Sequence, residues 1–421
     1  MGDYKYLINV SNKNNNKFYE MIEESNGTFT VNYGRVDVTK ITLSYPMSLW
    51  DKKYKEKLKP AKGYEDITEY RSQEQPAVET KNSDGDSIIS HDSHVAEIVS
   101  ILQDYAKAHS AKVYNVKAVS VTQIQVDAAQ VCIDTLTSLV KDSFGKKTGK
   151  NKWSINVFNT ELMKLFRTIP RKMKNVNDHL ITANTTADQI NDMVSEEQSN
   201  LDSMASQVVA PTIINENEEV DTKADKDQKT LLETLGLHME LLTCPDELKK
   251  VKKNADEHKD RVTKVYKVVN NDTQTVFDTN LGKASNQDTK LFWHGSRNQN
   301  WWFIVQQGLK IRPSGAIHTG SMFGDGIYFA AEADKSMGYT DSGRWARGNS
   351  NGKVYMALYE VHVGNQYTIQ SSDSGLSYKK IRSKGDYHST WGKKGHSLYR
   401  HEFIIYQSHQ STIKYLVEFK D

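Results

Sequence analysis

The spacing of the apolar residues changes twice along this chain of 421 residues. Residues 1–75 contain short runs of alternating apolar side chains separated by Asn and Gly turn signals, which is the pattern of half-buried strands. Residues 93–212 repeat their apolar positions at helical spacing, and residues 228–421 return to strand-like runs with short helical segments between them. The spacing therefore predicts a multidomain α+β chain: a small β-rich module, an all-α helical bundle and a C-terminal antiparallel-sheet domain.

Polar segments separate these three parts. Residues 76–92 are rich in Ser, Asp and Gly and contain few apolar residues, so we predict a linker there. The acidic sequence NENEEVDTKADKDQK precedes the last domain and is predicted to be a second linker or a surface loop. The chain is too long for one ordinary core, which agrees with a division into two or three domains.

The composition argues against several classes of protein. Lys and Arg number 55 and Asp and Glu 53, so any affinity for nucleic acid must come from a local patch. Cys132 and Cys244 are the only cysteines of the sequence, which gives no disulfide framework or zinc cluster and favours an intracellular compartment. Because no apolar run is long enough, we expect no signal peptide, no transmembrane segment and no membrane partner.

Three clusters in the last domain contain residues suited to catalysis: LFWHGSR at 291–297, GSMFGDGIYFAAEADKSMGYT at 320–340 and LYRHEFIIY at 398–406. Taken singly, each has an ordinary structural explanation, since a lone His after an apolar strand is usually structural. Together, in this order and with these separations, they resemble the signature of the poly(ADP-ribose) polymerase family. The resemblance covers about residues 228–421 closely and implies an ADP-ribosyltransferase fold that uses NAD as its substrate.

The resemblance implies that His294, Tyr328 and Glu402 are the catalytic residues. Cleavage of the bond between nicotinamide and ribose creates an oxocarbenium-like centre, as in glycoside hydrolysis, and a nearby carboxylate stabilises that centre. By resemblance, Glu402 supplies the carboxylate, hydrogen-bonds the ribose 2′-hydroxyl and orients or deprotonates the acceptor hydroxyl. His294 is expected to hold the adenosine ribose. This chemistry requires no metal, and the sequence has no metal-ligand spacing.

The same resemblance implies a set of contacts with NAD. Tyr328 and Tyr339 are expected to sandwich the nicotinamide ring. Gly295 should present its backbone to the carboxamide, where a side chain would block the approach, and Ser336 should add a hydroxyl contact. Lys335 matches a basic position beside the reacting ribose. The full set of expected NAD contacts is His294, Gly295, Ser296, Asn300, Lys310, Tyr328, Lys335, Ser336 and Tyr339.

The sequence also departs from the family pattern. Ser321 stands where Tyr is frequent, the residues that flank Glu402 differ, and the region before Glu402 is shorter than in the best-known members. The His-Tyr-Glu combination is the one associated with elongation in the family, so we predict polymer synthesis on acceptor proteins, including the chain itself. The alternatives are transfer of a single ADP-ribose to protein or to nucleic-acid ends, and a catalytically inactive DNA-binding scaffold.

The first two parts of the chain resemble modules that accompany this family. GTFTVNYGRVDVTK is similar to the WGR domain, with Tyr33 in place of Trp, and the 93–212 bundle is similar to the helical regulatory domain. Tyr33 is expected to stack on a sugar or base edge, and Arg35 to pair with a phosphate or to reach the neighbouring domain. The resemblance implies activation by DNA breaks or nicks and a nuclear location, or a nucleoid or cytoplasmic one in a prokaryote or virus.

Overall fold

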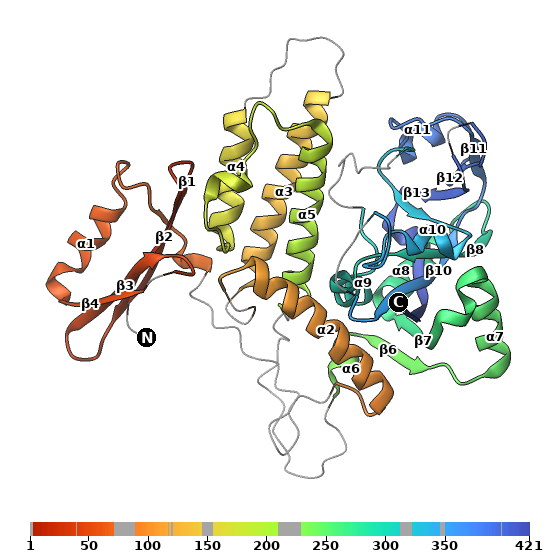
Figure 1. Cartoon of the computed structure of the whole chain (residues 1–421), viewed down its shortest axis with the longest axis horizontal. Helices are drawn as coiled ribbons and strands as arrows, with labels where there is room; N and C mark the ends of the chain where they lie inside the picture. The colour runs from red at the N-terminus through yellow and green to blue at the C-terminus, as the bar shows by residue number, and fades with distance from the viewer. Residues whose placement is uncertain are drawn as a thin grey trace. The chain divides into compact units, whose positions relative to one another are not determined.

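A computed structural model describes residues 3–38, 40–70, 89–116, 118, 121–144, 155–208, 229–311, 322–345, 350–396 and 398–421. The chain forms two compact units, each described here by itself (Figure 1). The N-terminal unit contains residues 1–77 and 107–212, and the C-terminal unit contains residues 78–106 and 213–421. The predicted linker at 76–92, up to residue 88, and Ser321 lie outside the described residues.

The N-terminal unit begins with an antiparallel sheet in the order β4-β3-β2-β1-β5. Its strands are β1 (Tyr4–Ser11), β2 (Asn15–Glu23), β3 (Thr28–Arg35), β4 (Ile41–Pro46) and β5 (Glu65–Asp66). Helix α1 (Trp50–Lys57) packs on one face, where the Trp50 ring meets Phe29 edge-on at 5.1 Å between centroids.

The opposite face of the sheet shares a core with helices. Because side chains alternate along a strand, Tyr6, Ile8 and Val10 point away from α1. They join one buried cluster with residues of α3 (Gln123–Phe144), α4 (Ile155–Thr168) and α5 (Ala187–Ala205). Helix α3 contacts both α4 and α5 (Figure 1). The β-rich module and the helices, predicted as separate domains, therefore lie in one compact unit.

Helix α2 (Ser93–Val113) is divided between the two units at residue 106. The Asp92 carboxylate accepts hydrogen bonds from the backbone N–H groups of His94 and Val95 and so caps the start of the helix. Ile98 and Leu102 are buried among strands of the C-terminal unit. The structure thus differs from the predicted boundary before residue 93, because this apolar stripe packs on the C-terminal unit and not on the bundle.

Two sheets form the centre of the C-terminal unit. The first is antiparallel, in the order β6-β7-β14-β10-β8, and the second has the order β11-β12-β13-β9. In the second sheet β11 and β12 are parallel, so the predicted antiparallel arrangement does not hold for that pair. The strand bounds are β6 (Leu237–Leu241), β7 (Val262–Asn270), β8 (Thr289–Gly295), β9 (Ile327–Phe329), β10 (Lys353–His362), β11 (Gln366–Ile369), β12 (Ser389–Gly392), β13 (Glu402–Ile405) and β14 (Ser411–Lys420).

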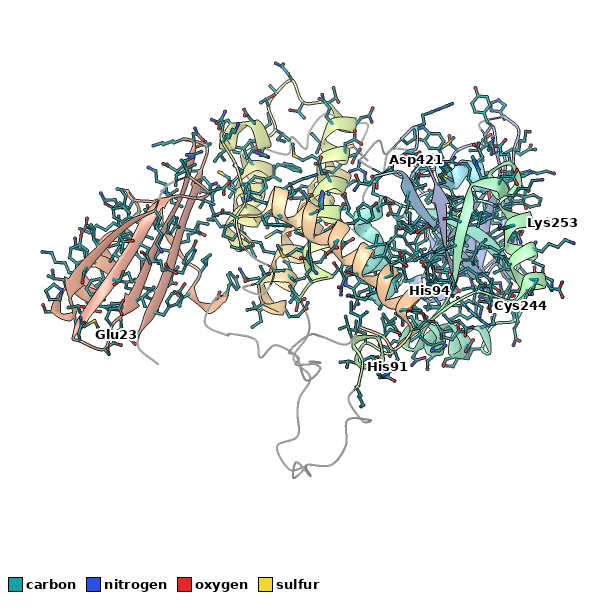
Figure 2. All side chains as sticks on the ribbon, turned by 60° about the horizontal axis from the view of Figure 1, so that its bottom comes forward. Glu23, His91, His94, Cys244, Lys253 and Asp421 are labelled. Atoms are coloured by element: carbon teal, nitrogen blue, oxygen red, sulfur yellow. The ribbon has the colours of Figure 1, made fainter. Side chains whose placement is uncertain are left out.

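Short helices connect these strands. They are α6 (Leu231–Thr234), α7 (Pro245–Asn254), α8 (Asn271–Leu281), α9 (Trp301–Gln307), α10 (Ala333–Met337) and α11 (Tyr378–Arg382), together with the 3-10 turns η5 (Asp256–Arg261), η6 (Asn298–Asn300) and η7 (Ser408–Gln410). The N-terminal unit has a 3-10 turn of its own, η4 (Val176–His179). Cys244 precedes α7 at the surface, and Lys253 extends outward from the end of that helix (Figure 2). Among the described residues, no helix combines the length and hydropathy of a membrane span.

Candidate active site

The two sheets of the C-terminal unit meet at the edge strands β8 and β9. Trp293 and Ala330 exchange backbone hydrogen bonds of 2.8 and 3.0 Å across this junction. The rings of Phe292 and Phe403 stack at 4.0 Å behind it. The junction brings His294, on β8, against Tyr328, on β9, although the two residues are 34 positions apart in the sequence.

A hydrogen bond shows which ring nitrogen of His294 carries the hydrogen. Its Nδ1 lies 3.1 Å from the carbonyl oxygen of Tyr328, and a carbonyl can only accept, so Nδ1 carries the hydrogen. Burial lowers the pKa of His294 to about 4, and the ring is therefore neutral near pH 7. In this tautomer the unprotonated Nε2 can accept a hydrogen bond from a hydroxyl group.

Tyr328 has a hydroxyl that is already satisfied. This hydroxyl accepts a 3.0 Å hydrogen bond from the N–H of Phe323 and donates one of 2.8 Å to the carbonyl of Gly324. Burial also raises the pKa of Tyr328, so the phenol stays protonated. What this residue can offer to a ligand is the face of its ring.

Glu402 is the first residue of β13, the strand that pairs with β9. Ile404 lies opposite Tyr328, so Glu402 is two residues farther along the neighbouring strand. Its Oε1 is paired with the ammonium of Lys335, on α10, and the two side chains are only 8% and 13% exposed. Its Oε2 is buried and has no hydrogen-bond partner within the described part of the chain. One carboxylate oxygen is thus held, and the other is available to accept.

Gly295 allows α10 to approach β8. A Cβ atom at this position would lie 1.9 Å from the carbonyl oxygen of Ser336, which is far inside van der Waals contact. The glycine was predicted because a side chain would block the ligand. The structure supplies a different reason, since a side chain would first collide with the helix that places Lys335 and Ser336.

Tyr339 follows α10 and is paired with an aromatic residue that the sequence analysis missed. Its ring lies 5.0 Å from that of Trp345, with a tilt of 38° between the planes. The backbone N–H of Trp345 donates to the carbonyl of Gly338, which closes the loop. Trp345 is 57% exposed, an unusual state for a large apolar side chain. The only signal in the sequence was a Trp in a Gly- and Arg-containing loop beyond the KSMGY motif.

A sequence model of the poly(ADP-ribose) polymerase catalytic domain matches residues 245–397. This range contains His294, Tyr328 and Lys335 and ends before Glu402. The poly(ADP-ribose) polymerase-like protein 100L of Invertebrate iridescent virus 6 is 36% identical over 160 residues, which are 37% of this chain and 83% of the viral protein. This chain belongs to the poly(ADP-ribose) polymerase family.

Two further relatives match this member of the family over segments of different length. The uncharacterized protein 101L of the same virus is 31% identical over 205 residues, or 49% of this chain and 77% of that protein. Poly(ADP-ribose) polymerase 2 of Zea mays is 39% identical over 105 residues, which are 24% of this chain and 15% of the maize protein. The shared part identifies the catalytic domain of a family that uses NAD as its substrate.

Three more residues expected to contact NAD in this family member flank α9, two before its start and one beyond its end. Asn300 donates from its side-chain amide to the hydroxyl of Ser296 at 3.0 Å, so these two residues form one polar group beside His294. Lys310 is exposed and is separated by one residue from the segment 312–321, which is outside the described part of the chain. The structure therefore brings Ser296 and Asn300 together and leaves Lys310 with no assigned place in the site.

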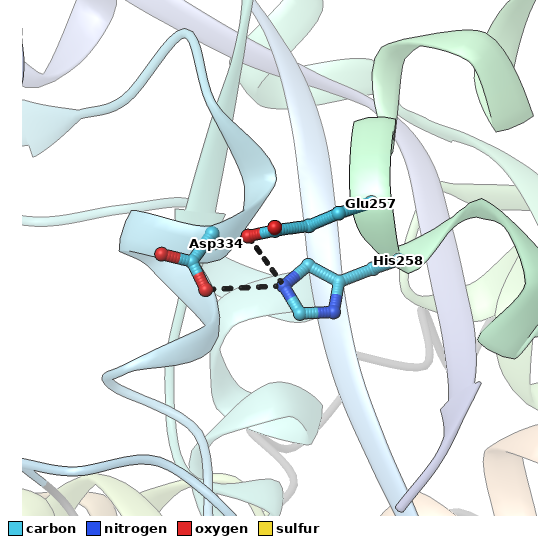
Figure 3. Close-up of side chains that lie close together, drawn as sticks. All are labelled: Glu257, His258 and Asp334. Atoms are coloured by element: carbon cyan, nitrogen blue, oxygen red, sulfur yellow. Dashed lines mark hydrogen bonds and ion pairs between the residues drawn. The ribbon is translucent and has the colours of Figure 1, made fainter.

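A cluster of charged side chains lies beside α10 in this family member. Nε2 of His258 is 3.3 Å from Asp334 Oδ1 and 3.9 Å from Glu257 Oε1 (Figure 3). These atoms lie close enough together to hold a metal ion. However, Arg400 Nη2 lies 2.5 Å from Asp334 Oδ2, and Arg261 Nη1 lies 3.3 Å from His258 Nδ1. The two guanidinium groups contact the other oxygen of Asp334 and the other ring nitrogen of His258, so the three atoms that face one another remain a possible metal-binding set.

The same contacts link α10 to the strand that carries Glu402. Asp334 pairs with Arg400, and the next residue, Lys335, pairs with Glu402. Two adjacent positions of the helix therefore hold two positions at the start of β13. Of these residues only Lys335 and Glu402 were predicted from the motifs, although Asp334 directly precedes Lys335 and Arg400 lies two residues before Glu402.

The residues expected to contact DNA lie in the N-terminal unit. Arg35 donates hydrogen bonds to the carbonyl oxygens of Asn14 at 2.7 Å and Lys174 at 2.6 Å. Of the two predicted roles, the reach toward the helical part is the one seen here. Tyr33 lies 6.2 Å from Tyr19 between ring centroids and close to the ammonium of Lys57.

Proposed function

We propose that this chain is an NAD-dependent protein ADP-ribosyltransferase that builds poly(ADP-ribose) on acceptor proteins, including itself, in response to DNA breaks. The observation that carries this proposal is the state of Glu402. Its carboxylate is buried beside Tyr328, with one oxygen paired to Lys335 and the other without a partner among the described residues. A buried acceptor without a partner is costly for a fold, so a ligand hydroxyl is the group expected to satisfy it.

The reaction follows from this arrangement. The bond between ribose C1″ and the nicotinamide nitrogen breaks, and nicotinamide leaves with the bonding electron pair as a neutral base. An acceptor hydroxyl or carboxylate oxygen then forms a bond to C1″, and a hydroxyl acceptor loses its proton to Glu402 or to water. Glu402 stabilises the positive charge that develops on the ribose, a kind of effect worth about 3–4 kcal/mol for one well-placed group.

His294 and Tyr328 supply binding rather than proton transfer. A neutral His294 with its hydrogen on Nδ1 accepts a hydrogen bond from a ribose hydroxyl through Nε2. Tyr328 offers its ring face to the nicotinamide, because its hydroxyl is bonded to the backbone of Phe323 and Gly324. Tyr339 is proposed as the second aromatic surface, and its contact with the Trp345 ring supports this role.

Elongation rather than single transfer is proposed because Glu402 is retained with His294 and Tyr328. Activation by DNA breaks or nicks is proposed from the order of the modules: a WGR-like sheet, a helical part and the catalytic domain. A nuclear or nucleoid location would follow from that activation. Because Arg35 is bonded to the carbonyls of Asn14 and Lys174, the DNA proposal rests on the module resemblance and not on a free guanidinium.

The experiment is incorporation of biotinylated NAD by the purified full chain, with and without nicked DNA. The test variant is Glu402→Gln. The matched control is Glu240→Gln, which makes the same change on β6 at an exposed ion pair with Lys267. We expect a DNA-stimulated ladder of products from the wild type and from the control. We expect one short product or none from Glu402→Gln.

Other results would select the alternatives. A single product band from the wild type would indicate transfer of one ADP-ribose, and loss of that band after nuclease treatment would place it on nucleic-acid ends. Equal incorporation with and without DNA would contradict the regulatory part of the proposal. No release of nicotinamide under any condition, from a folded chain that binds DNA, would indicate an inactive scaffold.

A further inference from the structure

A cavity lies in the C-terminal unit, apart from the residues of the candidate active site. It has a volume of about 360 Å³ and is lined by residues of α8, α11 and η7, the end of β10 and the segment before β12. His294, Tyr328, Lys335 and Glu402 are not among the residues that line it. We call it the histidine cavity, because His362, His388 and His409 converge there from three separate elements.

Two of these imidazoles are packed against each other. The ring centroids of His362 and His388 are 5.2 Å apart, and the two residues are 6% and 5% exposed. Burial and the neighbouring His362 lower the pKa of both His388 and His409. Both of those rings are therefore neutral near pH 7, and a nearby anion would favour their charged form.

The hydrogen bonds of the cavity exclude a nucleophilic serine. The backbone N–H of Asn365 donates to His388 Nδ1 at 3.2 Å, so the neutral ring carries its hydrogen on Nε2. That Nε2 faces the hydroxyl of Ser285 at 3.2 Å, and the hydroxyl in turn donates to Asp386 at 2.6 Å. His388 cannot take a proton from Ser285 in this tautomer. The Ser285, His388 and Asp386 group is therefore not a hydrolytic triad.

The charges that face the cavity favour an anion. Lys283 and Arg382 are cationic, and Asp386 is the only carboxylate among the lining residues. Asp386 lies 2.5 Å from Arg382 Nη1, so its charge is already compensated. Lys283 has no carboxylate within ion-pair distance in the described part of the chain. The remaining titratable group of the lining, Tyr378, adds a hydroxyl that can donate.

We propose that the histidine cavity binds a phosphate-bearing anion, held by Lys283 and His409 at its mouth with His362 and His388 behind them. His362 Nε2 lies 2.7 Å from the carbonyl of Asn286, so the groups left to donate are the Lys283 ammonium, the Tyr378 hydroxyl and a protonated His409. A phosphate matches these donors, because the one acid of the lining is already neutralised by Arg382. His409 makes no hydrogen bond within the described residues, so its ring is available to donate once protonated. The phosphate could be free inorganic phosphate or part of a nucleotide such as ADP-ribose, since both present the same oxygens.

Binding should be coupled to proton uptake. If one imidazole gains a proton as the anion enters, affinity rises by up to roughly tenfold for each unit by which the pH falls. Calorimetric titration of the full chain with inorganic pyrophosphate, at about pH 6 and about pH 7.5 and one ionic strength, measures this. We expect tighter binding at the lower pH, with protons taken from the buffer.

The variants Lys283→Ala and His409→Ala test the location. Each should weaken pyrophosphate binding by roughly tenfold, the effect of one charged hydrogen bond. The matched control is Lys290→Ala, which removes an exposed lysine of the same unit that does not line the cavity. His362 and His388 are left unchanged because they are buried. All three variants should keep the NAD activity of the wild type, which separates this site from the proposed transferase site.

Competition by ADP-ribose identifies the source of the phosphate. Displacement of pyrophosphate by ADP-ribose, lost in Lys283→Ala, would support the site and indicate a nucleotide ligand. Pyrophosphate binding without such competition would support the site and indicate free phosphate. The proposal is overturned if pyrophosphate does not bind at about pH 6, or if it binds equally well to Lys283→Ala, His409→Ala and the wild type.

Discussion

At the scale of single residues, Lys335 and Glu402 depend on each other because both charges are buried. Replacing Lys335 with Met keeps the length of the side chain but leaves the Glu402 carboxylate unpaired. We expect this change to lower the free energy of unfolding by about 3–5 kcal/mol, the usual effect of breaking a buried ion pair. Urea denaturation followed by tryptophan fluorescence measures it.

The double variant Lys335→Met with Glu402→Gln is the control for this ion pair. It removes both charges, so it should recover most of the stability lost in Lys335→Met. It should recover none of the transferase activity, because the carboxylate is gone. If Lys335→Met alone were as stable as the wild type, the ion pair would have no structural role.

The protonation of His294 should make the stability of the chain depend on pH. Its pKa of about 4 in the folded chain lies below the ordinary 6.5, so the unfolded chain binds a proton first as the pH falls. The stability that a neutral His294 contributes is therefore complete above about pH 6.5 and is lost as the pH drops toward 4. Comparing urea denaturation at these two pH values, wild type against His294→Gln, should show roughly 2–3 kcal/mol more loss in the wild type.

Enzyme kinetics provide an independent test of the same assignment. If neutral His294 accepts a ribose hydroxyl, the KM for NAD has no inflection from this residue between about pH 5.5 and 8. Nuclear magnetic resonance of the imidazole protons identifies the group that titrates. An inflection in KM near pH 6.5 that disappears in His294→Gln would contradict the buried, neutral state.

Individual residues were predictable where a motif fixed them. His294, Tyr328 and Glu402 come from three separate clusters, and the structure places them on the neighbouring strands β8, β9 and β13. The pairing of Trp345 with Tyr339 was not predictable, because a contact across a loop leaves no periodic pattern in the sequence. The role of Gly295 was also hidden, since its constraint comes from the carbonyl of Ser336, 41 positions later.

At the scale of elements, the packing of β8 against α10 predicts the effect of Gly295→Ala. The new methyl group would need the space of the Ser336 carbonyl, so α10 must move and take Lys335 with it. We expect a loss of about 1–3 kcal/mol in stability and a large fall in kcat/KM for NAD. Thermal unfolding and nicotinamide release measure the two effects.

Gly282→Ala is the matched control for that substitution. Gly282 follows α8 in the same unit, and its nearest contact would be 3.4 Å away, which is ordinary van der Waals distance. This variant should keep both the melting temperature and the activity. Equal effects of the two substitutions would show that the close approach of α10 is not what Gly295 permits.

Helices and strands with a regular spacing of apolar residues could be predicted, but the surfaces and strands that they pack against could not. Helix α4 ends at Thr168, two residues before Pro170, because proline cannot continue the helix. The parallel pairing of β11 with β12 was missed, since four-residue strands have no pattern that specifies direction. The partner of α2 was also missed, because an apolar stripe predicts burial but not the surface that buries it.

At the scale of the whole molecule, the division of α2 predicts how the chain can be shortened. Its residues up to 106 belong to the C-terminal unit, whose core includes Ile98 and Leu102. A fragment of residues 229–421 lacks these side chains and exposes the apolar surface that they cover. Because one buried Leu or Ile contributes about 1.5–3 kcal/mol, we expect this fragment to be poorly soluble or to melt well below the full chain.

Substitutions within the full chain test the same dependence without truncation. Ile98→Ala should lower the free energy of unfolding of the C-terminal unit by about 2–5 kcal/mol, because it leaves a cavity in that core. His94→Ala is the control, since His94 lies exposed on the same helix (Figure 2). A synthetic peptide of residues 89–106, added to the 229–421 fragment, should raise its melting temperature, and the same peptide with Ile98→Asp should not. If the fragment without the peptide were as stable as the full chain, residues 93–106 would be dispensable to the C-terminal unit. The predicted assignment of residues 93–212 to the helical bundle would then hold.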